Sequence, residues 1–259
     1  MHLLILAQPL PPRSLETLGV FLEERTVQTP YGQAGPFALR QKQNAPGLWI
    51  LPYFGGPNRT DPRATLWAAK TLGVQRILAW DSVIGLDHAL QRGDVILPRD
   101  YIDWTKHQPT TFFEKTGAGY ISQVPPFCPD ISAAIDRHLP KAKPVIYLGG
   151  EGPRRETAAE ARMFQQWGAQ VRGLNLVPET YLAKELELCF AAIGVVAALG
   201  ADRPHAPGQG QVREADQNIL DALPAILADI SQPPTCGCDH LQQGPVQRGV
   251  LAPDWRTWG

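Results

Sequence analysis

The segment from Tyr147 to Glu185 alternates between the signatures of strands and helices within 39 residues. It begins in an apolar run of strand length, turns at a glycine-rich loop, and continues as a helix that Thr157 can cap. A second apolar run, at 171–177, precedes another helix that starts at Pro178. Strand, helix, strand and helix in this order predict an α/β unit, in which loops at the carboxyl ends of strands bind ligands.

Strand and helix patterns alternate along the rest of the chain as well. Strands are expected at Leu3–Ala7, Phe21–Val27, Leu48–Leu51, Arg76–Trp80, Asp94–Leu97 and Ile193–Ala197, and helices at Thr65–Leu72, Ile131–Leu139 and Val212–Ile230. Residues 81–85 are expected to form a loop after their strand. The alternation predicts an α/β three-layer sandwich within a single domain, 1–259, whose residues 231–259 form an extended C-terminal arm.

Charge and hydropathy exclude several classes of partner. The formal net charge is −1 and no basic run occurs, so we expect no binding to nucleic acid. The apolar opening at Leu3–Ala7 is too short for a signal-peptide core or a membrane span. We therefore expect a cytoplasmic protein that does not bind membranes.

The four cysteines allow two interpretations. Cys128 and Cys189 lie in apolar surroundings and are expected to be buried thiols. Cys236 and Cys238, followed by His240, could belong to a zinc site, or they could be a tail motif with a redox-active or strained disulfide. A second ligand pair at the usual spacing is missing, so the sequence predicts no metal site.

Several motifs resemble the purine nucleoside phosphorylase and 5′-methylthioadenosine phosphorylase family. The resemblance is carried by Glu-Gly-Pro-Arg at 151–154, Glu-Thr at 156–157, Trp-Gly-Ala at 167–169, Val-Pro-Glu at 177–179 and Ala-Lys-Glu at 183–185. It extends to Thr-Pro-Tyr-Gly at 29–32 and to the helix at 64–73. The resemblance implies a three-layer α/β/α sandwich with a central mixed β-sheet, a nucleoside-like substrate, no cofactor and a homo-oligomer, usually a trimer.

The residues that the family uses for phosphate and for the leaving base differ here. The first strand leads to Ala7-Gln8-Pro9, where the family has a Gly-Gly-Thr/Ser-Gly turn that holds phosphate. Tyr53-Phe54-Gly55 occupies the place of an Arg-His-Gly triplet. Ala198 and Gly200 stand where an Asp-x-Asp pair would protonate the purine. The sequence therefore predicts little ordinary phosphorolysis.

The remaining candidates form a binding shell. Asp81 and Asp202 are the candidate catalytic carboxylates, although an aspartate at 81 would repel phosphate and Asp202 has the alternative of a solvated loop residue. By the resemblance, Ser82 would contact phosphate or sugar, Glu156 would bind the edge of the purine, and Tyr120 stands where a family residue reaches the sugar of a neighbouring subunit. The candidate binding residues are Ser82, Tyr120, Arg155, Glu156, Leu174, Asn175 and Phe54.

Two functions stay open. One is an enzyme that binds a purine nucleoside, methylthioadenosine-like, or a related N-glycoside, and cleaves its glycosidic bond with phosphate or with water. The other is a catalytically inactive relative that binds nucleosides or has a structural role. Carboxyl groups that lie in one pocket and have shifted pKa values would favour the enzyme. A pocket filled by aromatic and arginine side chains would favour the inactive relative.

Overall fold

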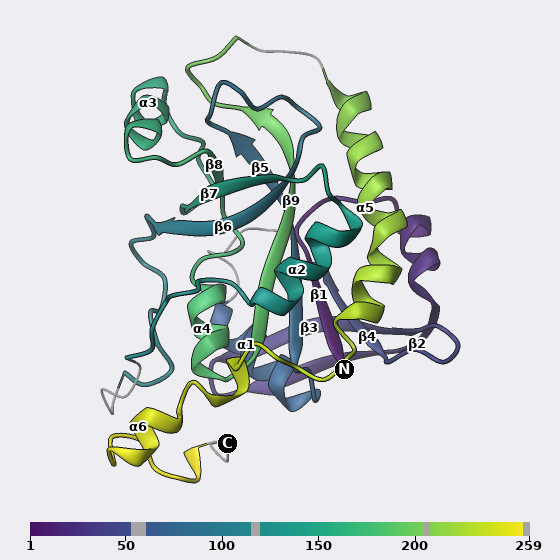
Figure 1. The fold of residues 1–259 in the computed structure, drawn as a ribbon, viewed down its shortest axis with the longest axis vertical. Helices are drawn as coiled ribbons and strands as arrows, with labels where there is room; N and C mark the ends of the chain where they lie inside the picture. The colour runs from purple at the N-terminus through teal and green to yellow at the C-terminus, as the bar shows by residue number, and fades with distance from the viewer. Residues whose placement is uncertain (53–60, 115–119, 205–207, 256–259) are drawn as a thin grey trace.

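The computed structural model describes residues 1–52, 61–114, 120–204 and 208–255, whose strands join in one mixed sheet (Figure 1). Its order is β2-β3-β4-β1-β5-β8-β7-β6-β9. The strands are β1 (His2–Leu6), β2 (Val20–Thr29), β3 (Gly32–Gln41), β4 (Leu48–Pro52), β5 (Arg76–Gly85), β6 (Val95–Asp103), β7 (Lys143–Gly149), β8 (Val171–Gly173) and β9 (Cys189–Leu199). The expected central mixed sheet is confirmed.

One part of this sheet closes on itself. β5 pairs with β8 on one side and, in parallel, with β9 on the other. β9 also pairs antiparallel with β6, which continues through β7 back to β8. The five strands β5, β8, β7, β6 and β9 therefore form a closed ring of pairings, from which β1, β4, β3 and β2 extend as an open sheet.

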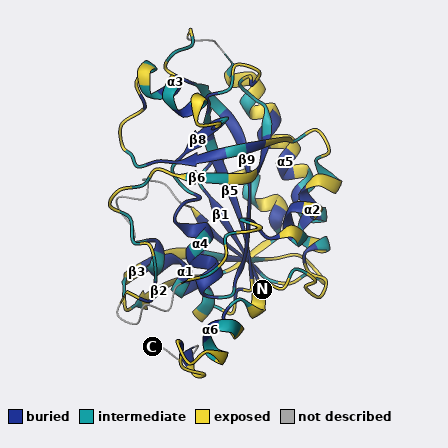
Figure 2. Ribbon diagram, turned by 60° about the vertical axis from the view of Figure 1, so that its left-hand side comes forward, coloured by how far each residue is buried: buried dark blue, intermediate teal, exposed yellow. Residues whose placement is uncertain are grey.

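Helices cover the two faces of the sheet in three layers. α2 (Pro129–His138) and α5 (Gln209–Asp229) pack together against β9, while α1 (Pro62–Thr71) and α4 (Glu179–Glu185) pack together on the opposite side. α3 (Ala158–Gln166) lies at one end of the molecule and α6 (Gln243–Gln247) at the other (Figure 1). Figure 2 shows that burial is deepest along the central strands. The predicted sandwich is thus observed.

Local sequence signals explain where several helices begin. The Asp61 side chain accepts a hydrogen bond from the backbone N–H of Arg63 and caps α1. Thr157 and Glu160 form a reciprocal capping box at the start of α3. α5 buries an apolar stripe against the sheet, as its 3.6-residue periodicity predicts; the stripe consists of Ala215, Ile219, Leu220, Leu223 and Ile226.

Three expectations about the elements were wrong. Residues 81–85 are not a loop but the second half of β5, because β9 is long enough to pair with them through Leu199. β3 was missed, since Gly32, Gly35 and Pro36 interrupt its apolar pattern. The described tail is not simply extended, because it contains a 3-10 turn, Cys238–His240, and the short helix α6.

Most buried side chains belong to one hydrophobic core that runs from β1 to Trp255 in the tail. A smaller cluster under α3 contains Leu86, Leu148, Ala161, Phe164 and Ala169. Across the described ranges, no helix combines the length and the apolar character that crossing a membrane requires.

Candidate active site

A buried carboxyl group occupies the middle of β5. Asp81 is 0% exposed. Its Oδ1 accepts hydrogen bonds from the side-chain amide of Asn175 (2.7 Å) and from the backbone N–H of Ser82 (2.8 Å). Its Oδ2 accepts one from the hydroxyl of Tyr147 (2.7 Å), whose oxygen in turn accepts from the backbone N–H of Asn175 (3.2 Å). These donors are uncharged, so they hold the carboxyl group without supplying a positive charge.

The surroundings of Asp81 change its acidity. Burial raises the pKa of Asp81 to about 6, although the hydrogen bonds from Asn175, Tyr147 and Ser82 act in the opposite direction. The carboxyl group of Asp81 is therefore half protonated about two pH units higher than an exposed aspartate, whose pKa is about 4. A buried carboxyl group with a perturbed pKa is a typical functional-site candidate.

A glycine makes this arrangement possible. A Cβ atom at Gly173, the last residue of β8, would lie 2.2 Å from the Tyr147 hydroxyl and 2.5 Å from Asp81 Oδ2. Atoms cannot approach so closely, and the obstruction comes from groups that are themselves buried and hydrogen-bonded. The short strand β8 can therefore pass the Asp81 group only because position 173 has no side chain.

A second carboxylate lies between two arginines. The Glu156 side chain is 1% exposed. Its Oε1 accepts hydrogen bonds from the Arg155 guanidinium (3.2 Å) and from the backbone N–H of Ala201 (3.1 Å), and its Oε2 accepts one from Arg172 (3.4 Å). The Arg155 guanidinium also donates to the carbonyl of Leu199 (2.8 Å). These contacts tie the glycine-rich turn after β7 to the end of β9.

Two cavities meet at Glu156. The larger, of about 350 Å³, is lined by Arg92, Arg155, Glu156 and the residues that end β9 and follow it, 197–201 and 203–204. The smaller, of about 170 Å³, lies on the other side; charged and aromatic side chains line it, and they include Lys106, Glu151, Arg154 and Arg172. The larger cavity has the size of a small-ligand site and few convergent polar groups, as expected of one.

The short strand β8 connects the two carboxylates. The Arg172 side chain points to Glu156, while the next residue, Gly173, passes directly beside Asp81. Asn175, two residues further on, then binds Asp81. Four residues in a row along the chain thus place a guanidinium at one carboxylate and a neutral amide at the other. Sequence reasoning proposed Asp81, Glu156 and Asn175 separately, and the structure brings them together around residues 172–175.

Asp202 lies apart from both cavities. Its Oδ2 accepts hydrogen bonds from His88 (3.2 Å) and from the Gln165 amide (3.0 Å), and its side chain is 6% exposed. Burial raises its pKa, but the hydrogen bonds from His88 and Gln165 outweigh that effect and leave the pKa lowered. Its catalytic role stays a prediction that requires this network to open. It is not simply a solvated loop residue either.

The remaining candidates are placed as follows. Ser82 and Leu174 are half-buried beside the Asp81 group, and Leu174 Cδ1 would lie 3.1 Å from a Cβ atom on Gly152. Tyr120 is 95% exposed and does not line either of the two cavities at Glu156. Phe54 lies outside the described residues.

Sequence reasoning missed Tyr147, Arg172 and a buried pair at the end of β1. The Gln8 amide, 3% exposed, donates to Asp216 on α5 (2.8 Å). Burial raises the pKa of Asp216 to about 6, and the hydrogen bond from Gln8 opposes this shift. The position where the resemblance implies a phosphate-binding turn thus has its side chain directed inward. A lone polar residue inside an apolar run was the only available signal for Tyr147 and Arg172.

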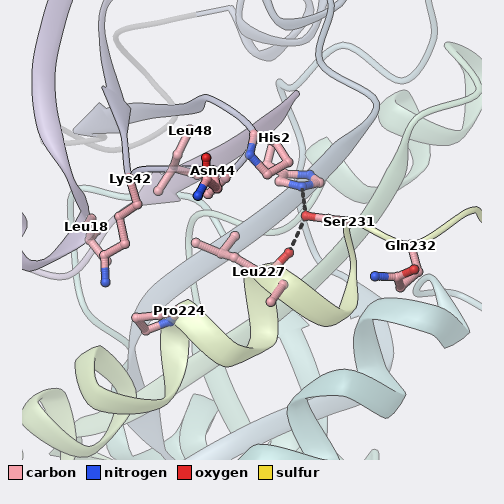
Figure 3. A pocket seen from close by; sticks show the side chains of 12 residues that line it. His2, Leu18, Lys42, Asn44, Leu48, Pro224, Leu227, Ser231 and Gln232 are labelled. Carbon is pink, nitrogen blue, oxygen red and sulfur yellow. Dashed lines mark hydrogen bonds between the residues drawn. The ribbon is translucent and has the colours of Figure 1, made fainter.

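A further cavity lies at the other end of the strands. Its volume is about 280 Å³, and it is formed by the start of β1 and β4 against the end of α5 (Figure 3). There His2 Nε2 and Ser231 Oγ are 2.9 Å apart, and Ser231 donates to the carbonyl of Leu227. Ligands of α/β proteins bind at the carboxyl ends of strands. This cavity is at the amino end of β1 and is not our candidate site.

The fold and this arrangement define a class, and comparisons with known proteins agree. A family model described as the Phosphorylase superfamily matches residues 10–231, so the chain belongs to that superfamily. Within it, the chain belongs to the purine nucleoside and methylthioadenosine phosphorylase family. The family resemblance of the sequence motifs is thereby confirmed.

Two relatives and one solved structure illustrate the similarity. The chain is 30% identical over 233 residues to a probable S-methyl-5′-thioinosine phosphorylase of Methanothermobacter thermautotrophicus, covering 86% of this chain and 83% of the relative. It is 33% identical over 238 residues to the S-methyl-5′-thioadenosine phosphorylase of Pyrococcus furiosus, covering 85% and 91%. A crystal structure of a methylthioadenosine phosphorylase from an antarctic soil metagenomic library superposes with a TM-score of 0.82 at 23% identity, covering 99% and 96%, and supports the fold.

Proposed function

We propose that this protein binds a purine nucleoside, with the base in the cavity beside Glu156, and cleaves its N-glycosidic bond. By name, one relative described above is a probable S-methyl-5′-thioinosine phosphorylase and the other an S-methyl-5′-thioadenosine phosphorylase. Solved structures of similar fold hold adenine or tubercidin. The observation that carries the proposal is the buried Glu156 carboxylate at the wall of a cavity of about 350 Å³.

The hydrogen-bonding capacity of Glu156 favours a 6-oxopurine base. An ionised carboxylate has about four acceptor positions. Arg155, Ala201 and Arg172 use three of them, two at Oε1 and one at Oε2. The position left on Oε2 can accept from an N–H group but cannot donate. N1 of a 6-oxopurine carries such a hydrogen, whereas N1 of a 6-aminopurine is an acceptor and would face the carboxylate unfavourably.

We further propose that inorganic phosphate is not the ordinary acceptor. The Gln8 side chain after β1 is bonded to Asp216 instead of facing a ligand, and Pro9 has no N–H to offer an anion. The buried Asp81 would oppose an anion whenever it is ionised. In the corresponding hydrolysis, a water oxygen bonds to the anomeric carbon, the carbon–nitrogen bond breaks, and the base takes up the proton.

A second candidate is a nucleoside-binding protein without activity. Ala198 and Gly200, which line the cavity, have no side chain that could protonate a leaving base. Asp202 is held by His88 and Gln165 away from the cavity. Under this candidate the protein would bind the same nucleosides and release them unchanged.

The binding proposal is tested by calorimetry on Glu156→Gln. The control is Glu214→Gln, which makes the same change on the exposed surface of α5. A hydrogen bond to a charged group contributes about 1.5–3 kcal/mol. Inosine and methylthioinosine should therefore bind Glu156→Gln about 10- to 100-fold more weakly. Methylthioadenosine should lose less, because a glutamine amide can donate to its N1. Equal affinities in all three proteins would refute the assignment of Glu156.

The reaction is tested by chromatography of the same nucleosides with and without phosphate. Cleavage that proceeds without phosphate, releasing free ribose or methylthioribose, supports the hydrolytic proposal. Cleavage that requires phosphate and yields a sugar 1-phosphate refutes it and leaves the base assignment standing. Binding without any cleavage supports the inactive candidate. Failure of every nucleoside to bind contradicts both.

A further inference from the structure

The four cysteines, which are far apart in the sequence, gather at one place. Cys128 is the N-cap residue of α2, Cys189 is the first residue of β9, and Cys236 and Cys238 lie in the C-terminal tail. Their Sγ atoms all lie within 4.8 Å of one another, and those of Cys189 and Cys236 are 3.5 Å apart. All four are free thiols, and three of them are buried. We name this group the cysteine cluster.

Hydrogen bonds unrelated to the sulfur atoms hold the cluster together. The backbone N–H of Cys128 donates to the carbonyl of Phe190 (2.8 Å), which fixes the start of α2 beside the start of β9. The tail is fixed through Thr235, whose backbone N–H and hydroxyl both bind the carboxylate of Asp130 on α2 (2.8 and 2.7 Å). Gly237, with φ of +70°, provides the turn between the two tail cysteines. Backbone contacts and this turn thus position the cysteines independently of any bond between their sulfur atoms.

We propose that the cysteine cluster is a structural site for one Zn²⁺ ion, bound by four thiolates. Zinc in closed structural sites is tetrahedral, with each sulfur about 2.3 Å from the ion, which places the sulfurs about 3.8 Å from one another. Separations up to 4.8 Å need only small side-chain movements to reach this value. The exposed His240 is not a member of the cluster, although it follows the tail cysteines in the sequence.

The surroundings of the cluster favour negative charge. Cys128 lies at the amino end of α2, where the helix dipole stabilises a thiolate. Lys184 is largely buried, and its ammonium group, which donates to the carbonyls of Ser122 and Pro125, also interacts electrostatically with Cys238. Four thiolates and one Zn²⁺ carry a net charge of −2, and these two features offset part of it.

A zinc ion here would fasten the C-terminal tail to the body of the protein. The tail already binds through Gln242, whose amide donates to the carbonyl of Glu185 at the end of α4 (2.9 Å). Further along, the Trp255 ring lies 4.6 Å from the Lys70 ammonium of α1. The ion would add its binding free energy to folding, because the site does not exist in the unfolded chain.

The test measures metal content and coordination in the full-length protein. The protein is purified under reducing conditions without chelators, and its metals are quantified by mass spectrometry. We expect one zinc per chain. Replacing zinc by Co²⁺ should produce the intense visible absorption of a tetrahedral cobalt thiolate. Cys236→Ser should lower the affinity for Zn²⁺ by more than about 100-fold, beyond what loss of a supporting residue costs. The control His240→Ala should bind zinc like the wild type.

Two results would overturn the proposal. One is a reduced wild-type protein that takes up neither added Zn²⁺ nor Co²⁺. The other is the finding, by mass spectrometry of the unreduced protein, that the cysteines are joined in disulfides. If Cys236→Ser fails to fold, the wild type decides: a thiol-blocking reagent should release one zinc as four thiols react. Release of no metal counts against the site.

Discussion

Replacing Asp81 by Asn should change how the stability of this protein depends on pH. In the folded protein, burial raises the pKa of Asp81 from 3.8 to about 6. The native state therefore binds this proton more tightly than the unfolded chain does. Between these two pH values the free energy of unfolding must fall as pH rises, and above them the contribution is constant. Each pH unit is worth about 1.4 kcal/mol, so the whole change amounts to about 3 kcal/mol.

The asparagine variant lacks this titration. Urea unfolding of the wild type and of Asp81→Asn is measured at intervals from pH 3.5 to 8, under conditions where unfolding is cooperative. The wild type should lose about 3 kcal/mol relative to the variant as pH rises from about 4 to about 7. Asp221→Asn, which makes the same substitution on the exposed face of α5, is the control for the loss of a surface carboxyl group. A constant difference between wild type and Asp81→Asn would refute the reasoning that burial controls this carboxyl group.

Three further predictions concern the neighbourhood of the site. Gly173→Ala should destabilise the protein by about 1–3 kcal/mol, because its Cβ atom would overlap the Tyr147 hydroxyl; an unchanged melting temperature would contradict this. Thr157→Ala removes the capping box of α3 and should cost about 1 kcal/mol in urea unfolding, whereas Thr157→Ser should retain most of it. His88→Ala should raise the pKa of Asp202, which a carboxyl ¹³C NMR titration would detect; an unaltered pKa would exclude His88 as its partner.

The sequence predicted most elements because their signals are local. The expected helix at 212–230 is observed as α5 (Gln209–Asp229), since its apolar residues recur on one face. The strand expected at 76–80 was too short by half. Its continuation depends on pairing with β9, which is distant in the sequence and cannot be inferred from the residues of β5 alone. β3 was missed for a similar reason, because pairing with β2 and β4 outweighs its glycines and proline.

The sequence predicted the carboxylates of the candidate site but not the side chains that bind them. Glu156 was proposed from the family resemblance and Asp81 as a candidate catalytic carboxylate, while Arg172 and Tyr147 were not proposed at all. Both partners lie inside apolar strand segments, where periodicity indicates core residues. The register of β8 with its two neighbours determines which carboxylate each side chain meets: β7 sets Leu148 beside Arg172, and β5 sets Ile84 on its other side. The cysteine cluster escaped prediction likewise, because only folding supplies the tail cysteines with a second pair.

The two carboxylates of the site are suited to different roles because different groups donate hydrogen bonds to them. Two guanidinium groups and a backbone amide donate to Glu156 and fix the position of its carboxylate beside the cavity. Among the described residues, the donors to Asp81 are uncharged, and burial raises its pKa to about 6. Asp81 is therefore suited to change its protonation under physiological conditions. If this protein cleaves nucleosides, the rate should therefore change with pH near 6, and this change should be absent in Asp81→Asn. If the pH profile is unaltered in that variant, Asp81 does not take part in the reaction and its role is structural.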